Sequence, residues 1–241
     1  MSLVVDSVTK HFAGLTALKD VSFTLDQEEI LGVIGPNGSG KTTLVNVTTG
    51  ILDPDGGTVQ VDGRDMTGAA PDVIARAGVV RTFQTVRLFG GLSVWDNVAA
   101  VIRDPDRPID EVVEEHLERL GLGHLGSTPS SHLAYGLQRR LEIARALATH
   151  PRYLLLDEPA AGLNDVESAD LEETIRAIPR DPRWGCGVLI IDHDLRLITS
   201  LCDRLLVMAS GEVIAEGPPE EVRRQPQVVE AYIGRRKDEP R

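Results

Sequence analysis

Apolar residues recur along this chain in short runs, and the form of each run indicates a strand or a helix. Short runs that alternate or are continuously apolar, and that end at glycine or polar turn residues, are typical of β-strands. They predict strands at residues 3–8, 21–25, 30–34, 58–62, 78–83, 153–156 and 188–191, and a hairpin of 204–208 with 212–215. Helical periodicity predicts helices at residues 41–49, 94–102, 109–120, 136–149 and 166–178.

The order of these elements predicts an α/β fold. Strands alternate with helices, which favours a largely parallel, doubly wound core sheet. Between about residues 85 and 137 the pattern is mainly helical, so we expect a helical lobe inserted into a core made of residues 1–84 and 138–241. The whole chain is predicted to be a single domain, with its charged last residues, 235–241, forming a disordered tail.

The composition narrows the range of partners. The chain has 241 residues, with 25 Lys and Arg against 37 Asp and Glu, and its net charge is −12. Such a surface repels a phosphate backbone, so we expect no nucleic-acid partner. No apolar run approaches the ~18 residues that a membrane-spanning helix needs, and the N-terminus has no secretion signal. The protein is therefore expected neither to span a membrane nor to be secreted, although it can still dock onto a membrane partner.

A glycine-rich loop follows the apolar run at 30–34. It matches the phosphate-binding pattern G-x-x-x-x-G-K-[ST], and its residues are Gly35, Pro36, Asn37, Gly38, Ser39, Gly40, Lys41 and Thr42, with Thr43 next. Glycine permits backbone angles that turn successive N–H groups toward phosphate oxygens at the start of a helix. Lys41 would bridge the outer phosphates, the Thr42 hydroxyl would bind Mg²⁺, and Thr43 would contact the α-phosphate. An unliganded turn is the alternative, but the order of strand, loop and helix favours nucleotide binding.

Two acids, Asp157 and Glu158, end another apolar run. Because ligands of parallel sheets bind at the carboxyl ends of the strands, both carboxylates are expected at the same edge as the glycine loop. Asp157 would hold the water shell of the metal, and Glu158 would accept a proton from the attacking water. The alternative is that the acids merely terminate a strand, and the phosphate loop upstream makes this interpretation the less favoured one.

Gln84 and His193 also stand at the ends of predicted strands. His193 is placed to contact a γ-phosphate at the same edge of the sheet. A lone histidine at a strand end is more often a structural hydrogen-bonding residue, and a glutamine there is usually only polar. The functional interpretation of both residues therefore depends on the wider pattern.

A further motif, Leu133-Ala134-Tyr135-Gly136-Leu137 followed by QRRLEIARAL, precedes the strand that carries the two acids. With this motif the chain resembles, along almost its whole length, the nucleotide-binding subunit of an ATP-binding cassette (ABC) transporter, whose signature is LSGGQ. The resemblance implies a P-loop NTPase cassette with a RecA-like core sheet, an antiparallel β subdomain and an inserted helical lobe. It also implies that two cassettes pair head to tail, so that Ala134, Tyr135 and Gly136 contact the ATP held by the other subunit.

The resemblance also implies roles for single residues. Phe12 would stack on the adenine, Gln84 would sense the γ-phosphate, and His193 would be the switch histidine. The metal ligands that it implies are Thr42, Gln84 and, through water, Asp157. The implied cofactors are ATP and Mg²⁺.

Three positions depart from the family pattern. Ala134 stands where serine is usual, Leu137 where glutamine is usual, and Asn164 where the D-loop commonly has aspartate. These departures leave open whether the ATP site completed by this signature hydrolyses at full rate, and an unequal pair of subunits would tolerate a slower site. Both a homodimer and a heterodimer stay open.

Within the family, the segments DEPAAGLN, IDHDLRLI and PEEVRRQPQVVEAYIG look most like the ATPase subunit of branched-chain amino acid importers. That resemblance implies a peripheral subunit at the cytoplasmic face of the inner membrane. Its partners would be membrane permease subunits, a second ABC ATPase subunit and, indirectly, an external solute-binding protein. An apolar patch of Leu88, Phe89, Leu92 and Trp95 could dock the permease, with about half of these residues expected in the lobe's own core.

Other functions remain open at this point. Importers of urea, amides or other amino acids and the lipopolysaccharide-export ATPase share parts of the pattern. A soluble ABC ATPase of DNA repair, translation or cluster assembly is a second class, but its usual insertions or second cassette are not seen in this sequence. A P-loop kinase or GTPase is a third class, which the signature segment disfavours.

Overall fold

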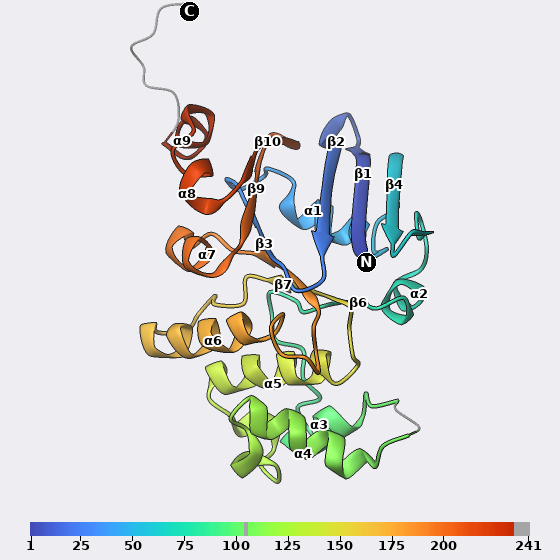
Figure 1. Cartoon of the computed structure of the whole chain (residues 1–241), viewed down its shortest axis with the longest axis vertical. Helices are drawn as coiled ribbons and strands as arrows, with labels where there is room; N and C mark the ends of the chain where they lie inside the picture. Colours follow the sequence, from blue (N-terminus) through green and yellow to red (C-terminus); the bar gives the residue numbers. More distant parts are fainter. Residues whose placement is uncertain (104–105, 234–241) are drawn as a thin grey trace, which may run out of the picture.

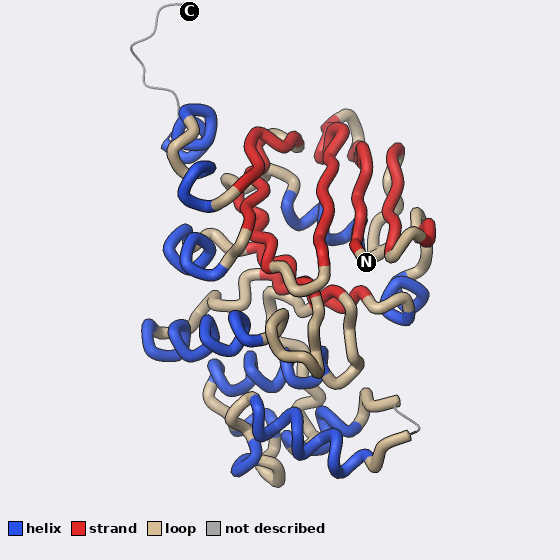
Figure 2. The backbone as a smooth tube through the Cα atoms, in the orientation of Figure 1, coloured by secondary structure: helices blue, strands red, loops and turns tan. Residues whose placement is uncertain are grey.

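The computed structural model describes residues 1–103 and 106–233, and the predicted tail at 235–241 lies outside them. Its strands form two sheets. In Figure 2 the strands lie in the upper half of the molecule with several helices around them, and the lower half consists of helices and their connecting loops. Within the described residues, no helix is long and apolar enough to cross a membrane.

The smaller sheet is antiparallel and has four strands in the order β2-β1-β4-β5. Its strands are β1 (Ser2–Phe12), β2 (Leu15–Asp26), β4 (Gly56–Val61) and β5 (Arg64–Asp65). Both β1 and β2 are longer than the sequence pattern predicted. The reason is a set of register shifts between Val5 and His11, which interrupt the alternation of apolar and polar positions without ending the strand.

The larger sheet carries the site and has six strands in the order β10-β9-β3-β8-β7-β6. Its strands are β3 (Ile30–Ile34), β6 (Val79–Arg81), β7 (Tyr153–Asp157), β8 (Gly187–Ile191), β9 (Arg204–Ala209) and β10 (Glu212–Gly217). All neighbouring pairs are parallel except β9 with β10. The prediction of a largely parallel core sheet is confirmed.

Apolar side chains pack on both faces of this sheet. Successive residues of a strand point to opposite faces, so a continuously apolar strand supplies two cores. In β7, for example, Leu154 and Leu156 pack in the cluster with helices α5 and α6, whereas Leu155 packs in the cluster with α1 and the small sheet. Burial on both faces holds β3, β7 and β8 in the sheet, and because these strands are parallel their carboxyl ends lie at the same edge.

The helices surround the large sheet and extend beyond it. They are α1 (Lys41–Thr48), α2 (Pro71–Arg76), α3 (Val94–Ala99), α4 (Ile109–Arg119), α5 (Tyr135–Leu147), α6 (Asp165–Ala177), α7 (Leu195–Leu201), α8 (Pro219–Val222) and α9 (Pro226–Ile233). Figure 1 shows α5 between α6 and the lobe helices α3 and α4. The short helices α2, α7, α8 and α9 were not predicted, because fewer than three turns give little periodicity to detect.

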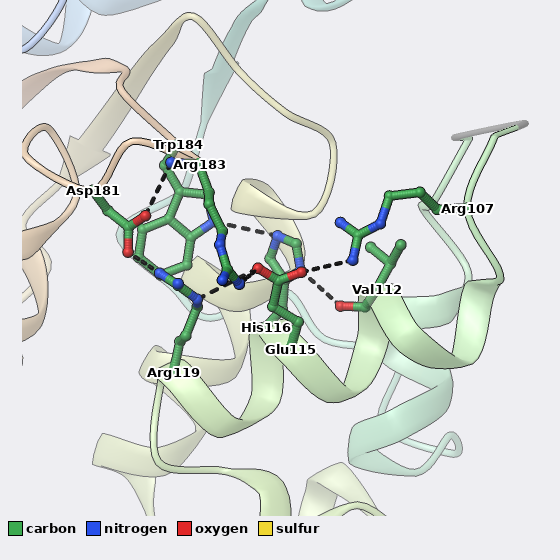
Figure 3. A network of polar contacts seen from close by, with 8 residues as sticks. All are labelled: Arg107, Val112, Glu115, His116, Arg119, Asp181, Arg183 and Trp184. Atoms are coloured by element: carbon green, nitrogen blue, oxygen red, sulfur yellow. Dashed lines mark hydrogen bonds and ion pairs between the residues drawn. The ribbon is translucent and has the colours of Figure 1, made fainter.

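A polar network attaches the lobe to the core (Figure 3). Glu115 on α4 pairs with Arg107 and Arg119 of the lobe and with Arg183, which lies beyond α6 in the core. His116 is buried, its Nδ1 lies 2.8 Å from the carbonyl of Val112, and its Nε2 accepts a hydrogen bond of 3.3 Å from the Trp184 indole. Because the indole can only donate, His116 is neutral with its proton on Nδ1. Burial lowers the pKa of this histidine, which keeps it in that form.

Candidate nucleotide site

Four segments end at the same edge of the large sheet. The glycine loop follows β3, His193 follows β8, Asp157 and Glu158 close β7, and Gln84 follows β6. These strands are consecutive neighbours and parallel. The sheet order therefore gathers residues that are more than 150 positions apart in the chain, from Gly35 to His193.

Two glycines of the loop are required by the fold. Gly35 has a φ of 154° and Gly40 a φ of 103°, a backbone region that other residues rarely adopt. A Cβ on Gly35 would collide with the Met208 carbonyl of the neighbouring strand, and a Cβ on Gly40 would lie 2.6 Å from the Ala17 carbonyl. Gly38 by contrast faces open space. The loop is thus pressed against β9 and β2 on one side and is open on the other.

Lys41 and the start of α1 lie at the open side. Gly40 caps α1 without a side-chain hydrogen bond, so the first-turn N–H groups are left for another acceptor. The Lys41 ammonium donates to the carbonyls of Gly35 and Pro36, at 2.6 and 3.1 Å. Burial lowers the pKa of Lys41, and the nearby carboxylates of Glu158 and Asp157 oppose that change. Beneath the loop, the Ser39 hydroxyl is buried and makes no hydrogen bond within the described part of the chain.

Asp157 is held by an arginine that the sequence analysis did not select. Arg81 on β6 donates to Asp157 Oδ2 at 3.1 Å and to Asn46 Oδ1 of α1 at 2.6 Å. The side chains of Arg81 and Asp157 are only 9% and 12% exposed. Burial raises the pKa of Asp157, Arg81 lowers it, and Glu158 raises it further. One guanidinium therefore ties this carboxylate to the helix that begins with Lys41.

Glu158 occupies a strained position between Gln84 and His193. Its φ of 46° is unusual for a residue with a side chain, and its N–H donates to the Ile191 carbonyl at 2.7 Å. Gln84 Nε2 donates to Glu158 Oε2 at 2.7 Å, whereas His193 Nδ1 lies 4.0 Å from Oε1. The sheet thus brings all three predicted side chains together, with Gln84 in direct contact and His193 71% exposed.

The two acids beside His193 shape its turn. Asp192 Oδ1 accepts from the backbone N–H groups of His193 and Asp194, at 2.7 and 3.0 Å. Asp194 in turn caps α7 by accepting from Arg196 N–H at 2.8 Å. Burial raises the pKa of Asp192. These contacts give both aspartates a structural role in presenting the imidazole.

The signature turn begins α5. Ala134 and Tyr135 are exposed, while Gly136 is buried against α6, where a Cβ would lie 2.9 Å from Glu167 Oε1. Asn164, at the D-loop position, caps α6 by accepting from Val166 and Glu167 N–H, each at 3.0 Å. Within residues 1–103 and 106–233, no hydrogen bond or ion pair joins the signature turn to the glycine loop of the same chain.

The remaining predicted residues lie outside this cluster of side chains. Phe12 is at the β1–β2 turn and is 42% exposed, with the Lys10 ammonium 5.7 Å from its ring. Of the apolar patch, Leu88 and Trp95 pack against the core, whereas Phe89 and Leu92 are exposed by 49% and 38%. The expectation that about half of this patch packs internally agrees with the structure.

The chain is similar in sequence to known proteins. The family model "ABC transporter" matches residues 18–161, and "Branched-chain amino acid ATP-binding cassette transporter" matches residues 212–238. The chain belongs to the ABC transporter family. It is 40% identical to LivG, the high-affinity branched-chain amino acid transport ATP-binding protein of Escherichia coli, and 39% identical to BraF of Pseudomonas aeruginosa. Each alignment covers 96% of this chain and 97% of the relative.

Solved structures show the same cassette fold. The ADP conformation of MJ1267, an ATP-binding cassette of an ABC transporter, has a TM-score of 0.86 at 34% identity and covers 98% of this chain and 100% of that one. A nucleotide-free ATP-binding cassette has a TM-score of 0.84 at 33% identity, with the same coverage. The resemblance and the P-loop NTPase fold predicted from the sequence are therefore confirmed.

Proposed function

We propose that this ABC cassette binds ATP with Mg²⁺ between its glycine loop and the carboxylates that follow β7, and hydrolyses the ATP to drive import of branched-chain amino acids. The observation that carries hydrolysis is the position of Glu158, which is held by Gln84 at the edge that also carries the glycine loop. The solute is inferred from the similarity to LivG and BraF and from the family match at residues 212–238.

The residues present fit a nucleotide with magnesium. The uncapped start of α1 offers N–H groups and a positive dipole to phosphate oxygens, and Lys41 adds a full charge. No cluster of three His, Cys, Asp or Glu side chains that could hold a metal occurs in the described ranges. Mg²⁺ does not need such a cluster, because it is commonly held by one or two protein oxygens together with phosphates and water. Thr42 would supply a direct ligand, with Asp157 acting through water.

Glu158 would act as the general base. Its side chain is 25% exposed, so one carboxylate oxygen can accept a proton from water while Gln84 donates to the other at 2.7 Å. The bound metal would supply positive charge where negative charge develops on the transferred phosphoryl group. His193, 4.0 Å from the same carboxylate, would contact the terminal phosphate from the β8 side.

The signature turn would complete the site of a second cassette. Ala134 makes no side-chain cap to α5, so the first N–H groups of this 13-residue helix are available to an outside anion. Asn164 caps α6 as an aspartate would, so that departure costs the fold nothing. Ala134 still lacks the hydroxyl that serine would offer to phosphate, and whether the second cassette is another copy or a distinct subunit stays open.

A cavity between core and lobe would receive the permease. It has a volume of about 680 Å³. Among the described residues its lining includes Arg103, Arg76, which pairs with Asp72 of the same lining, and Arg152, which pairs with Asp62. Figure 1 shows the elements around it, α2 on one side and the segment after α3 on the other. In a chain with a net charge of −12, such a cavity favours an acidic segment of a partner. We propose that the chain is a peripheral subunit on the cytoplasmic side of the membrane, with an external solute-binding protein acting through the permease.

Substitution of the proposed base tests this function. Glu158→Gln removes the carboxylate but keeps the side chain's size, so ATP affinity should stay within about twofold while hydrolysis falls by about 10²–10⁴-fold. ATP should then accumulate between paired cassettes, which light scattering would detect as an ATP-dependent increase in mass. Unchanged turnover in Glu158→Gln would remove this residue from the role of base.

A further inference from the structure

Arg139 is a fully buried cation that the proposed chemistry does not use. It lies on α5, one turn after Tyr135, and its side chain is 0% exposed. Burying a guanidinium is costly unless its charge is balanced and its donors are used. The hydrogen-bond partners of Arg139 therefore indicate its role in the structure.

Its guanidinium holds two consecutive backbone carbonyls. Arg139 Nη1 donates to Phe83 O at 2.8 Å, and Nη2 donates to Gln84 O at 2.6 Å and to the Tyr135 hydroxyl at 3.2 Å. The planar fork of arginine suits such paired acceptors, whereas a lysine ammonium is a single point of charge. Arg139 thus joins the signature turn to the backbone that carries Gln84.

Glu142, the counter-ion of Arg139, also contacts the backbone that follows β6. Glu142 is 3% exposed and accepts from Arg139 through Oε2 at 3.0 Å, while its Oε1 accepts from Arg87 N–H at 3.0 Å. Arg145, one turn further along α5, donates to the Arg87 carbonyl. One face of α5 therefore fixes residues 83–87 through backbone contacts. This segment leaves the sheet immediately after β6.

The segment that α5 fixes positions the proposed base. Gln84 uses its carbonyl for Arg139 and its side-chain amide for Glu158 Oε2. An unbroken series of polar contacts thus runs from Tyr135 through Arg139 and Gln84 to Glu158.

We propose that Arg139 is a positioning residue for hydrolysis, which fixes Gln84 relative to the signature turn and thereby sets the position of Gln84 against Glu158. This inference rests on the proposed function. In a pair of cassettes, the signature turn of one chain closes on the partner's nucleotide. Movement of that turn would then displace Arg139 and Gln84, and so change the position of Gln84 against Glu158 in the same chain. The two ATP sites would then be coupled within each subunit.

The test compares Arg139→Lys with the wild type in the assembled transporter. Lysine keeps the charge opposite Glu142 but cannot hold both carbonyls. We expect kcat to fall by about 10- to 100-fold, because small displacements of a catalytic group have effects of this size. KM and the calorimetric affinity for ATP should stay within about threefold. Arg139→Met, where it folds, should lower kcat at least as much.

A matched control is available on the same helix. Arg140 pairs with Asp170 at 2.7 Å, and in the described part of the chain it makes no hydrogen bond or ion pair with residues 83–87. Arg140→Met should therefore keep the wild-type kcat. In a Gln84→Ala background, Arg139→Lys should reduce kcat by less than about twofold further, since both changes act through one contact.

The possible outcomes separate the two claims. A wild type that hydrolyses ATP, with equal kcat in Arg139→Lys, would overturn the role of Arg139 alone. If the effects of Arg139→Lys and Gln84→Ala on kcat were fully additive, or if Arg139→Lys lowered thermal stability without changing kcat, the role of Arg139 would be structural only. A wild type without any ATP hydrolysis would overturn the proposed function and this inference with it.

Discussion

The pair of Arg81 and Asp157 offers a stability test of the site's architecture. Both side chains are nearly buried, 9% and 12% exposed, and they lie 3.1 Å apart. Arg81→Met removes the cation and keeps much of the apolar side chain, so Asp157 becomes a buried carboxylate without its counter-ion. Breaking a buried pair in this way costs about 3–5 kcal/mol. For a chain of this length, that loss lowers the midpoint of thermal unfolding by about 6–20 °C.

The measurement is thermal or denaturant unfolding of the purified chain, followed by circular dichroism. Arg76→Met is the matched control, because Arg76 pairs with Asp72 on the surface and both side chains are more than 60% exposed. An exposed pair contributes about 0–1 kcal/mol, so this variant should unfold close to the wild type. Adding Asp157→Asn to Arg81→Met should restore part of the loss, since it removes the uncompensated charge. Equal midpoints for Arg81→Met and Arg76→Met would refute the reasoning.

Two further predictions concern the lobe and the cavity. Burial lowers the pKa of His116, so this imidazole is protonated at a lower pH in the folded protein than in the unfolded chain. The contribution of neutral His116 to the free energy of unfolding is therefore complete above about pH 6.5 and is lost as the pH falls below that value. His116→Gln should therefore flatten the decline in unfolding free energy between about pH 6.5 and 5, which is at most about 1.4 kcal/mol per pH unit; an unchanged slope would contradict this. Arg103→Glu reverses a charge in the cavity and should lower transport by the assembled complex several-fold. Arg224→Glu should not, because Arg224 is exposed next to α8, on the other side of the molecule from α2. Equal transport by both variants would argue against permease docking at the cavity.

The parts of the site that are contiguous in the chain could be predicted from sequence. The glycine loop can be recognised from sequence because the backbone geometry of a phosphate-binding loop requires glycine at fixed spacings. In the structure Gly35 and Gly40 meet that requirement, since both have positive φ angles and no room for a Cβ. Asp157 and Glu158 could be placed because a buried strand has to end before two charges. Both inferences use only local rules.

Contacts between distant segments could not be predicted in this way. The bond from Arg139 to the Gln84 carbonyl spans 55 residues and depends on how α5 packs against the end of β6. That bond also explains why β6 ends at Arg81 rather than at residue 83, since the carbonyls of Phe83 and Gln84 serve Arg139 instead of a strand. Arg81 did carry a signal, because a charged residue within an apolar strand needs a buried partner.

Titration of the purified chain with ATP and Mg²⁺ by calorimetry tests the central claim most directly, because every role proposed above requires a nucleotide at the glycine loop. The account predicts that one ATP binds per chain and that Lys41→Ala, which removes the ammonium at the start of α1, weakens this binding markedly. Absence of binding to the wild type, or an affinity of Lys41→Ala within about twofold of the wild type's, would contradict it.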